Sequence, residues 1–227
     1  PSLCHIIKEY AAFGINEFII CAGYKQHVIK EYFADYFLHT SDITFDFTEG
    51  KNEMTVHRNT SEHWKVTVVD TGLNTMTGGR VKRVKEYLNG EPFMLTYGDG
   101  VANVDITKLV EFHKSHGKMV TMSAYNAGQR FGVLDIDANG NITDFREKTQ
   151  GDGNMINIGF MVCQPEFVDY IDGDSTVLEK APLETVAKMG QLMAYKHDGF
   201  WQCMDTVREK EQLEKMWNSG NAPWKVW

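Results

Sequence analysis

Apolar residues follow two alternating periods along this 227-residue chain. Helical spacing, with apolar positions three and four residues apart, recurs over segments of about eight to fourteen residues. These segments cover 3–14, 25–37, 77–90, 104–117, 183–190 and 206–217. Short apolar or alternating runs typical of strands lie between them, at 15–24, 64–72, 93–97, 118–125, 155–163 and 192–204. The alternation predicts an α/β domain with a mixed sheet.

Two β-hairpins are predicted in addition to these elements. The alternating runs 42–47 and 54–58 flank a glycine-containing turn, and such a turn sets the register of a hairpin. In the second hairpin, Asn139-Gly140 separates two alternating runs within 132–148, which is a strong hairpin signal. The pattern contains no internal repeat and no linker, so a single domain over 1–227 is expected.

Composition and charge narrow the class of protein. The net charge is −8, with 23 basic and 31 acidic residues, which argues against a nucleic-acid polymer or an anionic membrane as partner. A small anionic ligand needs only two or three cations and stays possible. The apolar runs are too short for a transmembrane helix, and the four cysteines lack CxxC spacing. Reduced thiols in a cytoplasmic protein are expected.

The stretch FMLTYGDGVANVD, 93–105, raises the question of chemistry. Its apolar strand ends on Asp99 between two glycines, and Asp205 likewise follows the apolar run FWQCM. In α/β sheets, ligands bind beyond the carboxyl ends of strands, and two carboxylates meeting there suit Mg²⁺. Two simpler interpretations stay open: Gly-Asp-Gly is also a common turn, and Asp205 could be the N-cap of the last helix.

Other polar residues at strand ends are candidate ligand contacts. The loop TGLNTMTGGR, 71–80, leads into a helix with Thr77 as candidate N-cap, and free N–H groups there could bind an anion or a base edge. An ordinary capped loop is the alternative. Lys25 and Lys148 could hold phosphate. Asn157 needs partners inside an apolar strand, either a sugar hydroxyl or a structural hydrogen bond. His113 and His116 indicate a solvated helix face rather than a metal site.

Taken in order, several motifs resemble one family. They are DTGLNTMTGGRVKRV, LTYGDGVANVDI, FGVLDI, FREK, MINIGF, FWQCMDT and APWKVW. Together they are similar to glucose-1-phosphate cytidylyltransferases, of the sugar-phosphate nucleotidyltransferase superfamily, over essentially the whole chain. The resemblance implies a Rossmann-like mixed sheet flanked by helices, of the nucleotide-diphospho-sugar transferase type, with added hairpins.

The resemblance also implies a reaction: CTP and α-D-glucose 1-phosphate give CDP-glucose and pyrophosphate, for dideoxy sugars of cell-surface polysaccharide such as O-antigen. Asp99 and Asp205 would hold Mg²⁺, and with Lys148 they would form the catalytic set. The loop residues Thr77, Gly78, Gly79 and Arg80 would face cytosine. The sugar-phosphate pocket would be lined by Gly132, Glu147, Lys148 and Asn157, with Lys148 on the phosphate and Glu147 on glucose hydroxyls.

The chain departs from the family pattern in two places. Cys203 stands where the pattern has proline. Relatives also begin with a strand, a glycine-rich loop ending in Thr-Arg and a Lys-Pro element, which together hold the triphosphate; these are expected to precede Pro1. The family suggests a homo-oligomer, and the tail APWKVW could lie in a subunit contact.

Three alternatives to this reading stay open. The first is an enzyme that makes UDP- or dTDP-glucose from the same sugar phosphate. The second is a non-catalytic subunit of the same fold. The third is a metal-dependent glycosyltransferase, for which DID at 135–137 would have to supply the carboxylate pair; that motif fits alternating strand residues before the Asn-Gly turn better.

Overall fold

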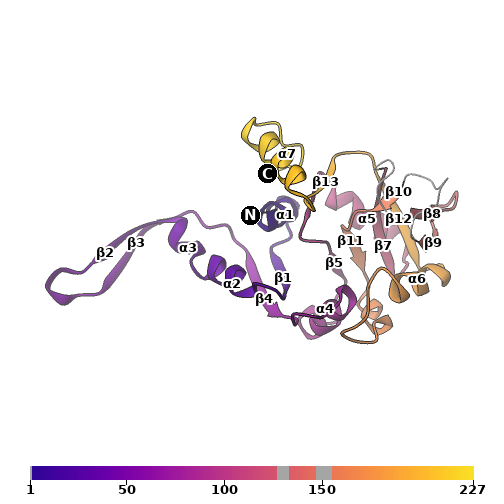
Figure 1. The fold of residues 1–227 in the computed structure, drawn as a ribbon, viewed down its shortest axis with the longest axis horizontal. Helices are drawn as coiled ribbons and strands as arrows, with labels where there is room; N and C mark the ends of the chain where they lie inside the picture. Colours follow the sequence, from indigo (N-terminus) through magenta and orange to yellow (C-terminus); the bar gives the residue numbers. More distant parts are fainter. Residues whose placement is uncertain (1, 127–132, 147–154) are drawn as a thin grey trace. The chain divides into compact units, whose positions relative to one another are not determined.

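The structure, a computed structural model, describes residues 2–126, 133–146 and 155–227. The chain groups into two compact units. The larger unit consists of Pro1–Ile15 and Thr75–Trp227, and the smaller unit of Asn16–Asn74. Figure 1 shows their elements in chain order.

The smaller unit contains a parallel strand pair, two helices and a hairpin. Strand β1 (Glu17–Ala22) pairs in parallel with β4 (Lys65–Asp70). Helices α2 (Gln26–Ala34) and α3 (Tyr36–His39) lead into β2 (Ser41–Asp46), which pairs with β3 (Glu53–Asn59) across the short 3-10 turn η1 (Thr48–Gly50). The first predicted hairpin is therefore confirmed, and Figure 1 shows it as a long two-stranded ribbon.

A five-stranded mixed sheet forms the centre of the larger unit. Strand β7 (Val120–Asn126) pairs antiparallel with both β10 (Met155–Asn157) and β11 (Met161–Cys163). Strand β11 then pairs with β5 (Phe93–Leu95), and β12 (Leu192–His197) pairs in parallel with β7. The predicted mixed sheet is confirmed.

The two faces of β7 are covered by different helices. Val120, Met122 and Ala124 belong to the main apolar cluster, together with Leu183 and Val186 of α6 (Ala181–Lys188). The residues between them, such as Thr121, alternate to the other face because side chains along a strand have a period of two. There, His113 and His116 of α5 (Ile106–His116) hydrogen-bond to the Thr121 hydroxyl.

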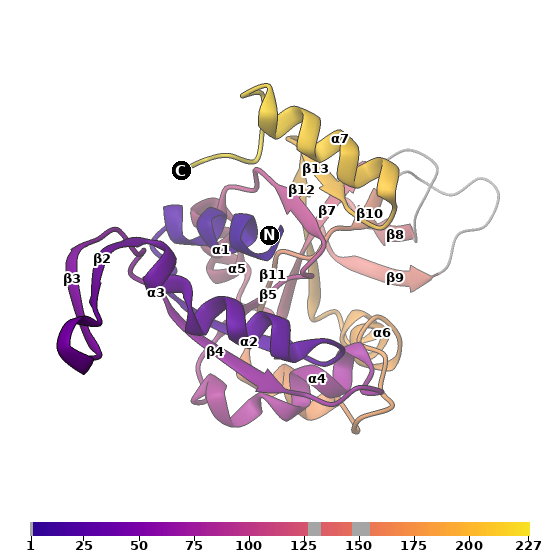
Figure 2. The same cartoon turned by 60° about the vertical axis from the view of Figure 1, so that its left-hand side comes forward.

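The remaining elements of the larger unit surround this sheet (Figure 2). Strand β8 (Val133–Ile136) pairs with β9 (Ile142–Arg146) across Asn139-Gly140, where Gly140 has φ +84°, so the second predicted hairpin is confirmed. The others are α1 (Ser2–Ala12), α4 (Thr77–Arg83), η2 (Lys85–Leu88), β6 (Gly100–Ala102), η3 (Pro165–Tyr170), β13 (Trp201–Cys203) and α7 (Val207–Asn218). Among the described residues, no helix has the length and apolar character needed to cross a membrane.

The C-terminal tail packs on its own chain. Trp224 is 2% exposed, and its Nε1–H donates to Nδ1 of His5 in α1 at 3.1 Å. The Trp224 ring also stacks on Phe200, with centroids 5.6 Å apart. Trp217 of α7 contacts the His5 ring edge-on at 4.4 Å. At least one tryptophan of APWKVW thus fills the core between α1 and α7.

Candidate active site

Asp99 and Asp205 lie at the adjoining ends of one strand pair. Strand β6 pairs antiparallel with β13, so that Gly100 faces Cys203. The ladder continues by one bond, in which Met204 N–H donates to the Asp99 carbonyl oxygen at 2.8 Å. Partial burial and then the negative charge of Asp205 raise the pKa of the Asp99 carboxyl. Two neighbouring carboxylates that repel one another in this way form a donor set that a divalent cation would relieve.

Asp205 is not the N-cap of the last helix. Thr206 is the N-cap, and it forms a capping box with Glu209: the Thr206 hydroxyl accepts from Glu209 N–H, and the Glu209 carboxylate accepts from Thr206 N–H at 2.9 Å. Because Thr206 caps the N-terminus of α7, the interpretation of Asp205 as its N-cap is wrong.

Cys203, Asp205 and Glu209 place potential ligand atoms within 4.8 Å of one another. The Glu209 carboxylate already accepts the main-chain N–H groups of Asp205 and Thr206. Burial raises the pKa of the Cys203 thiol to about 12, helped by the nearby Asp205 and Glu209 charges. The Glu209 carboxylate is thus occupied as part of the helix cap, whereas Asp205 follows the strand that pairs beside Asp99.

The two glycines beside Asp99 have different surroundings. A Cβ at Gly100 would lie 3.1 Å from Nε1 of Trp201, so glycine lets the indole pack against β6. A Cβ at Gly98 would meet open space. Packing against Trp201 therefore explains the glycine at position 100. At position 98 the absence of a side chain leaves room for a ligand to approach the backbone next to Asp99.

The glycine-rich loop differs from its prediction at the start of α4. Met76, not Thr77, is the N-cap. The N–H groups of Gly78 and Gly79, expected to be free, both donate to the Thr176 carbonyl oxygen, at 2.9 and 3.2 Å. A Cβ at either glycine would come within 2.8 Å of the Asp174–Thr176 main chain. These glycines allow α4 to pack on a neighbouring loop, and that loop occupies the donors.

A hydrogen-bonded chain joins Thr77 to Asn157. The Thr77 hydroxyl donates to Oε2 of Glu179 at 2.7 Å, and the Tyr97 hydroxyl donates to Oε1 of Glu179 at 2.6 Å. Asn157 Nδ2 donates to the Tyr97 hydroxyl at 3.2 Å. Burial, followed by the charge of Glu179 and its hydrogen bond, raises the pKa of Tyr97 well above its usual value. Two predicted ligand residues are thus connected through a side chain directly before Gly98-Asp99.

Sequence reasoning missed Tyr97 and Glu179. Tyr97 lies in the motif YGDG, and its position two residues before Asp99 was a usable signal. Glu179 lies outside any regular element, between η3 and α6, and local periodicity gave no reason to select it.

Some of the other predicted positions lie among the described residues and some do not. Arg80 lies on α4, close to Thr77 in sequence. Lys25 belongs to the smaller unit, where it follows β1 in a left-handed conformation with φ +54°. Gly132, Glu147 and Lys148 lie outside the described residues.

His113 and His116 do not form the solvated helix face that was expected: His113 is buried and His116 is half-buried. His113 is 2% exposed and shares the Thr121 hydroxyl with His116 at 2.8 and 2.7 Å. Burial lowers the pKa of His116 to about 4, and the charges of His113 and Lys118 act in the same direction. Both imidazoles are neutral structural groups between α5 and β7.

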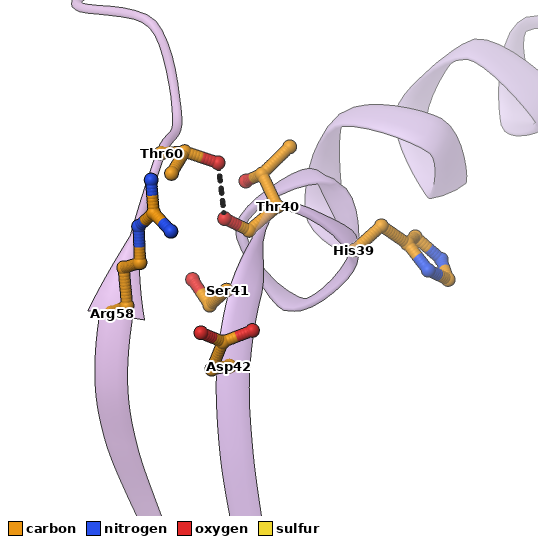
Figure 3. A pocket seen from close by; sticks show the side chains of 6 residues that line it. All are labelled: His39, Thr40, Ser41, Asp42, Arg58 and Thr60. Carbon is orange, nitrogen blue, oxygen red and sulfur yellow. Dashed lines mark hydrogen bonds between the residues drawn. The ribbon is translucent and has the colours of Figure 1, made fainter.

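The smaller unit has a polar cavity of about 360 Å³ at the base of its hairpin. Figure 3 shows its lining, with Thr60 donating to the Thr40 carbonyl oxygen at 2.8 Å. The cavity is lined by His39, Thr40, Ser41, Asp42, Arg58 and Thr60. These residues carry none of the predicted chemistry.

Comparison with known proteins places this arrangement in a class. Residues 2–206 match the family model described as nucleotidyl transferase. The fold is that of nucleotide-diphospho-sugar transferases. The structure matches apo UDP-glucose pyrophosphorylase with a TM-score of 0.73, over 97% of this chain and 87% of that one at 14% identity. It matches HddC from Yersinia pseudotuberculosis with a TM-score of 0.67, over 94% and 84% at 19% identity.

Sequence relatives are more similar and define the family further. The chain is 55% identical to glucose-1-phosphate cytidylyltransferase of Salmonella typhi over 228 residues, which is 100% of this chain and 88% of that protein. It is 41% identical to a probable glucose-1-phosphate cytidylyltransferase of Bacillus subtilis, with the same coverage. The chain belongs to the nucleotidyl transferases and, among them, to the glucose-1-phosphate cytidylyltransferase family.

Proposed function

We propose that the protein transfers a cytidylyl group from CTP to α-D-glucose 1-phosphate, giving CDP-glucose and pyrophosphate. Identity of 55% over the whole chain to a glucose-1-phosphate cytidylyltransferase is the observation that carries this proposal. Asp99 and Asp205, which the family resemblance assigns to Mg²⁺, follow adjoining strand ends, and this proximity supports the proposal.

The chemistry needs positioning and charge neutralisation more than acid–base groups. A phosphate oxygen of glucose 1-phosphate attacks the α-phosphorus of CTP in line and forms the new P–O bond. The bond between the α-phosphorus and the bridging oxygen breaks, and pyrophosphate leaves with that electron pair. Proton transfer is not required, and charge on the phosphates must be neutralised as they approach. A site with carboxylates and lysine is suited to this task.

Asp99 and Asp205 would hold Mg²⁺, which would neutralise phosphate charge during transfer. Burial and then the negative charge of Asp205 raise the pKa of Asp99, and a cation there would stabilise the charged carboxylate against both effects. The chain's own carboxylates would fix the ion beside the exposed Gly98, where a phosphate can approach.

Substrate recognition would be divided between two sets of residues. The loop of Thr77, Gly78, Gly79 and Arg80 would face cytosine, with its main-chain path set by packing on residues 174–176. Asn157 would bind glucose together with Gly132, Glu147 and Lys148. In this scheme Lys148 binds the phosphate and Glu147 accepts from sugar hydroxyls.

The cellular context follows from the same family. CDP-glucose would feed dideoxy-sugar and O-antigen synthesis in the cytoplasm.

We also propose that the protein forms a homo-oligomer. The hairpin of the smaller unit supports it, because Phe45, Phe47, Met54 and Val56 are 41–68% exposed there, and such apolar strands are usually covered by a partner.

A nucleotide-preference assay tests the proposal against its nearest alternative. The purified protein is given glucose 1-phosphate, Mg²⁺ and one of CTP, UTP or dTTP, and the nucleotide sugar is separated by chromatography. CDP-glucose should form at least tenfold faster than the other products. Faster UDP- or dTDP-glucose formation would assign the other nucleotide, and the absence of any product would favour a non-catalytic subunit.

A further inference from the structure

We propose that Glu179 is a positioning residue that joins the base-binding loop to the sugar-binding side through Thr77 and Tyr97. This inference rests on the proposed function, because it assigns a role between two substrate subsites. Glu179 itself would touch neither substrate. It would set where Thr77 and Asn157 stand relative to one another.

Each carboxylate oxygen of Glu179 accepts one hydroxyl. Thr77 donates to Oε2 at 2.7 Å and Tyr97 donates to Oε1 at 2.6 Å. Both distances are those of charge-assisted O–H···O⁻ bonds, which are about twice as strong as neutral ones. A single carboxylate therefore holds two hydroxyls, one from α4 and one from the segment that follows β5.

The direction of every proton in this chain is determined. Because the carboxylate only accepts, both hydroxyls must donate to it. Each hydroxyl oxygen then accepts from the next group outward: Thr77 from Leu178 N–H at 2.9 Å, and Tyr97 from Asn157 Nδ2 at 3.2 Å. If one of these hydrogen bonds were reversed, two donors would face each other. The hydrogen-bonded series from Thr77 to Asn157 therefore has one low-energy arrangement of its protons.

The same chain fixes the orientation of the Asn157 amide. Its Oδ1 accepts from Gly159 N–H at 2.8 Å, and its Nδ2 donates to Tyr97. Within the part of the chain that the structure describes, these two bonds use one amide N–H and one oxygen lone pair of Asn157 and leave one of each for a ligand. Their positions are set indirectly by Glu179, through Tyr97, and they are the groups that a sugar hydroxyl would meet.

The backbone around Tyr97 is shaped to hold its ring. Gly159 has φ +75°, and a Cβ there would lie 3.0 Å from Cδ2 of the Tyr97 ring. The next residue, Phe160, is fully buried with φ +45°, a conformation that costs energy for a non-glycine residue. This strained turn keeps the ring close to its contacts, so the hydroxyl has little freedom to find another acceptor.

Because Thr77 and Tyr97 both depend on the Glu179 carboxylate, a substitution at either residue should change the KM values for both substrates. Tyr97→Phe removes a hydroxyl on the sugar side and should raise the KM for CTP as well as that for glucose 1-phosphate, each by about three- to tenfold. Thr77→Val, which removes the hydroxyl at similar volume, should do the same from the base side. Glu179→Gln should lower kcat/KM for both substrates by about tenfold or more.

The experiment measures initial rates against each substrate for these three variants, for the double variant Tyr97→Phe/Glu179→Gln, and for Thr77→Ser, which keeps the hydroxyl. Thr77→Ser should recover most of the activity that Thr77→Val loses, because it keeps the hydroxyl that donates to Glu179. The double variant should be no worse than about twofold below Glu179→Gln alone, because both changes break the same link. Exposed Tyr87→Phe and Glu166→Gln serve as matched controls and should leave all constants unchanged.

Three results would overturn the inference. Effects confined to the substrate on the mutated side would show that the two subsites are independent. Multiplying effects in the double variant would show separate roles for Tyr97 and Glu179. A Thr77→Ser variant as impaired as Thr77→Val would show that packing rather than the hydroxyl matters. Wild-type turnover in the same assay tests the proposed function separately: an inactive wild type contradicts that function, whereas an active wild type with unaffected variants contradicts only the role of Glu179.

Discussion

Met204 donates its main-chain N–H to the carbonyl oxygen of Asp99 at 2.8 Å. This bond extends the β6–β13 ladder by one step and fixes Asp205, the next residue, beside Asp99. The two carboxylates come from distant parts of the sequence, and a single long-range strand pairing brings them together. The metal-binding proposal depends on that pairing.

Removing either carboxylate charge should abolish most of the activity. Asp99→Asn and Asp205→Asn should each lower kcat by about a hundredfold or more, or ~2.7 kcal/mol of transition-state stabilisation, because each removes a proposed Mg²⁺ ligand. Melting temperatures should change little, since neither side chain caps a helix. Steady-state kinetics and thermal melting check both statements, with exposed Asp172→Asn as control. Normal turnover with a lowered melting temperature would show that the residue is structural.

A substitution in the neighbouring helix cap should lower stability and leave kcat nearly unchanged. Thr206→Ala breaks the capping box with Glu209 and should cost about 1 kcal/mol of unfolding free energy. Its kcat should stay within a few-fold of the wild type, because Asp205 is retained. Urea denaturation measures the loss, and Thr206→Ser should restore stability. If Thr206→Ala were as inactive as Asp205→Asn, the separation of cap and metal ligand would be incorrect.

Much of this arrangement could be predicted from the sequence, because it depends on local patterns. Asn139-Gly140 marked its hairpin through a turn type that requires positive φ. Asp99 and Asp205 are predictable because each follows an apolar strand. Predictions failed for residues whose hydrogen-bond partners are distant in the sequence or lie on another element. The Thr77 hydroxyl bonds to Glu179 instead of capping α4, and His113 is buried against Thr121 instead of solvated. Both partners lie on other elements, so helix spacing alone could not identify them.

The buried Glu9 should make stability depend on pH. Glu9 is 0% exposed in α1, and burial raises its pKa to about 9. A carboxyl whose folded pKa lies above its unfolded value stabilises the folded state fully below the unfolded pKa of 4.5, and this contribution is lost as pH rises from there to the folded pKa of about 9. The loss should approach about 1.4 kcal/mol per pH unit within that window.

Replacing Glu9 by glutamine tests this relation directly. Glu9→Gln has no proton to lose, so it should be more stable than the wild type at pH 8 and about equally stable at pH 5. Denaturant midpoints at the two pH values measure the difference, with exposed Glu111→Gln as the control. A variant that is less stable than the wild type at pH 8 would show that Glu9 is needed in its charged form.

A substitution at Glu147 should affect the binding of only one substrate, because the family resemblance assigns this residue to glucose hydroxyls. Glu147→Ala should weaken glucose 1-phosphate binding by roughly 1.5–3 kcal/mol and leave CTP binding nearly unchanged. Isothermal titration with each substrate measures the two affinities. An equal loss for both would indicate that the residue supports the fold.

The most direct test of cytidylyl transfer is a pyrophosphate-release assay on the full-length gene product, with each component omitted in turn. With CTP, glucose 1-phosphate and Mg²⁺ together, pyrophosphate and CDP-glucose should appear in equal amounts. Omission of any one component should reduce release to background, because the sugar phosphate is the attacking group and the cation neutralises the phosphates. Pyrophosphate release without glucose 1-phosphate, or undiminished release after chelation of the metal, would contradict the proposed mechanism.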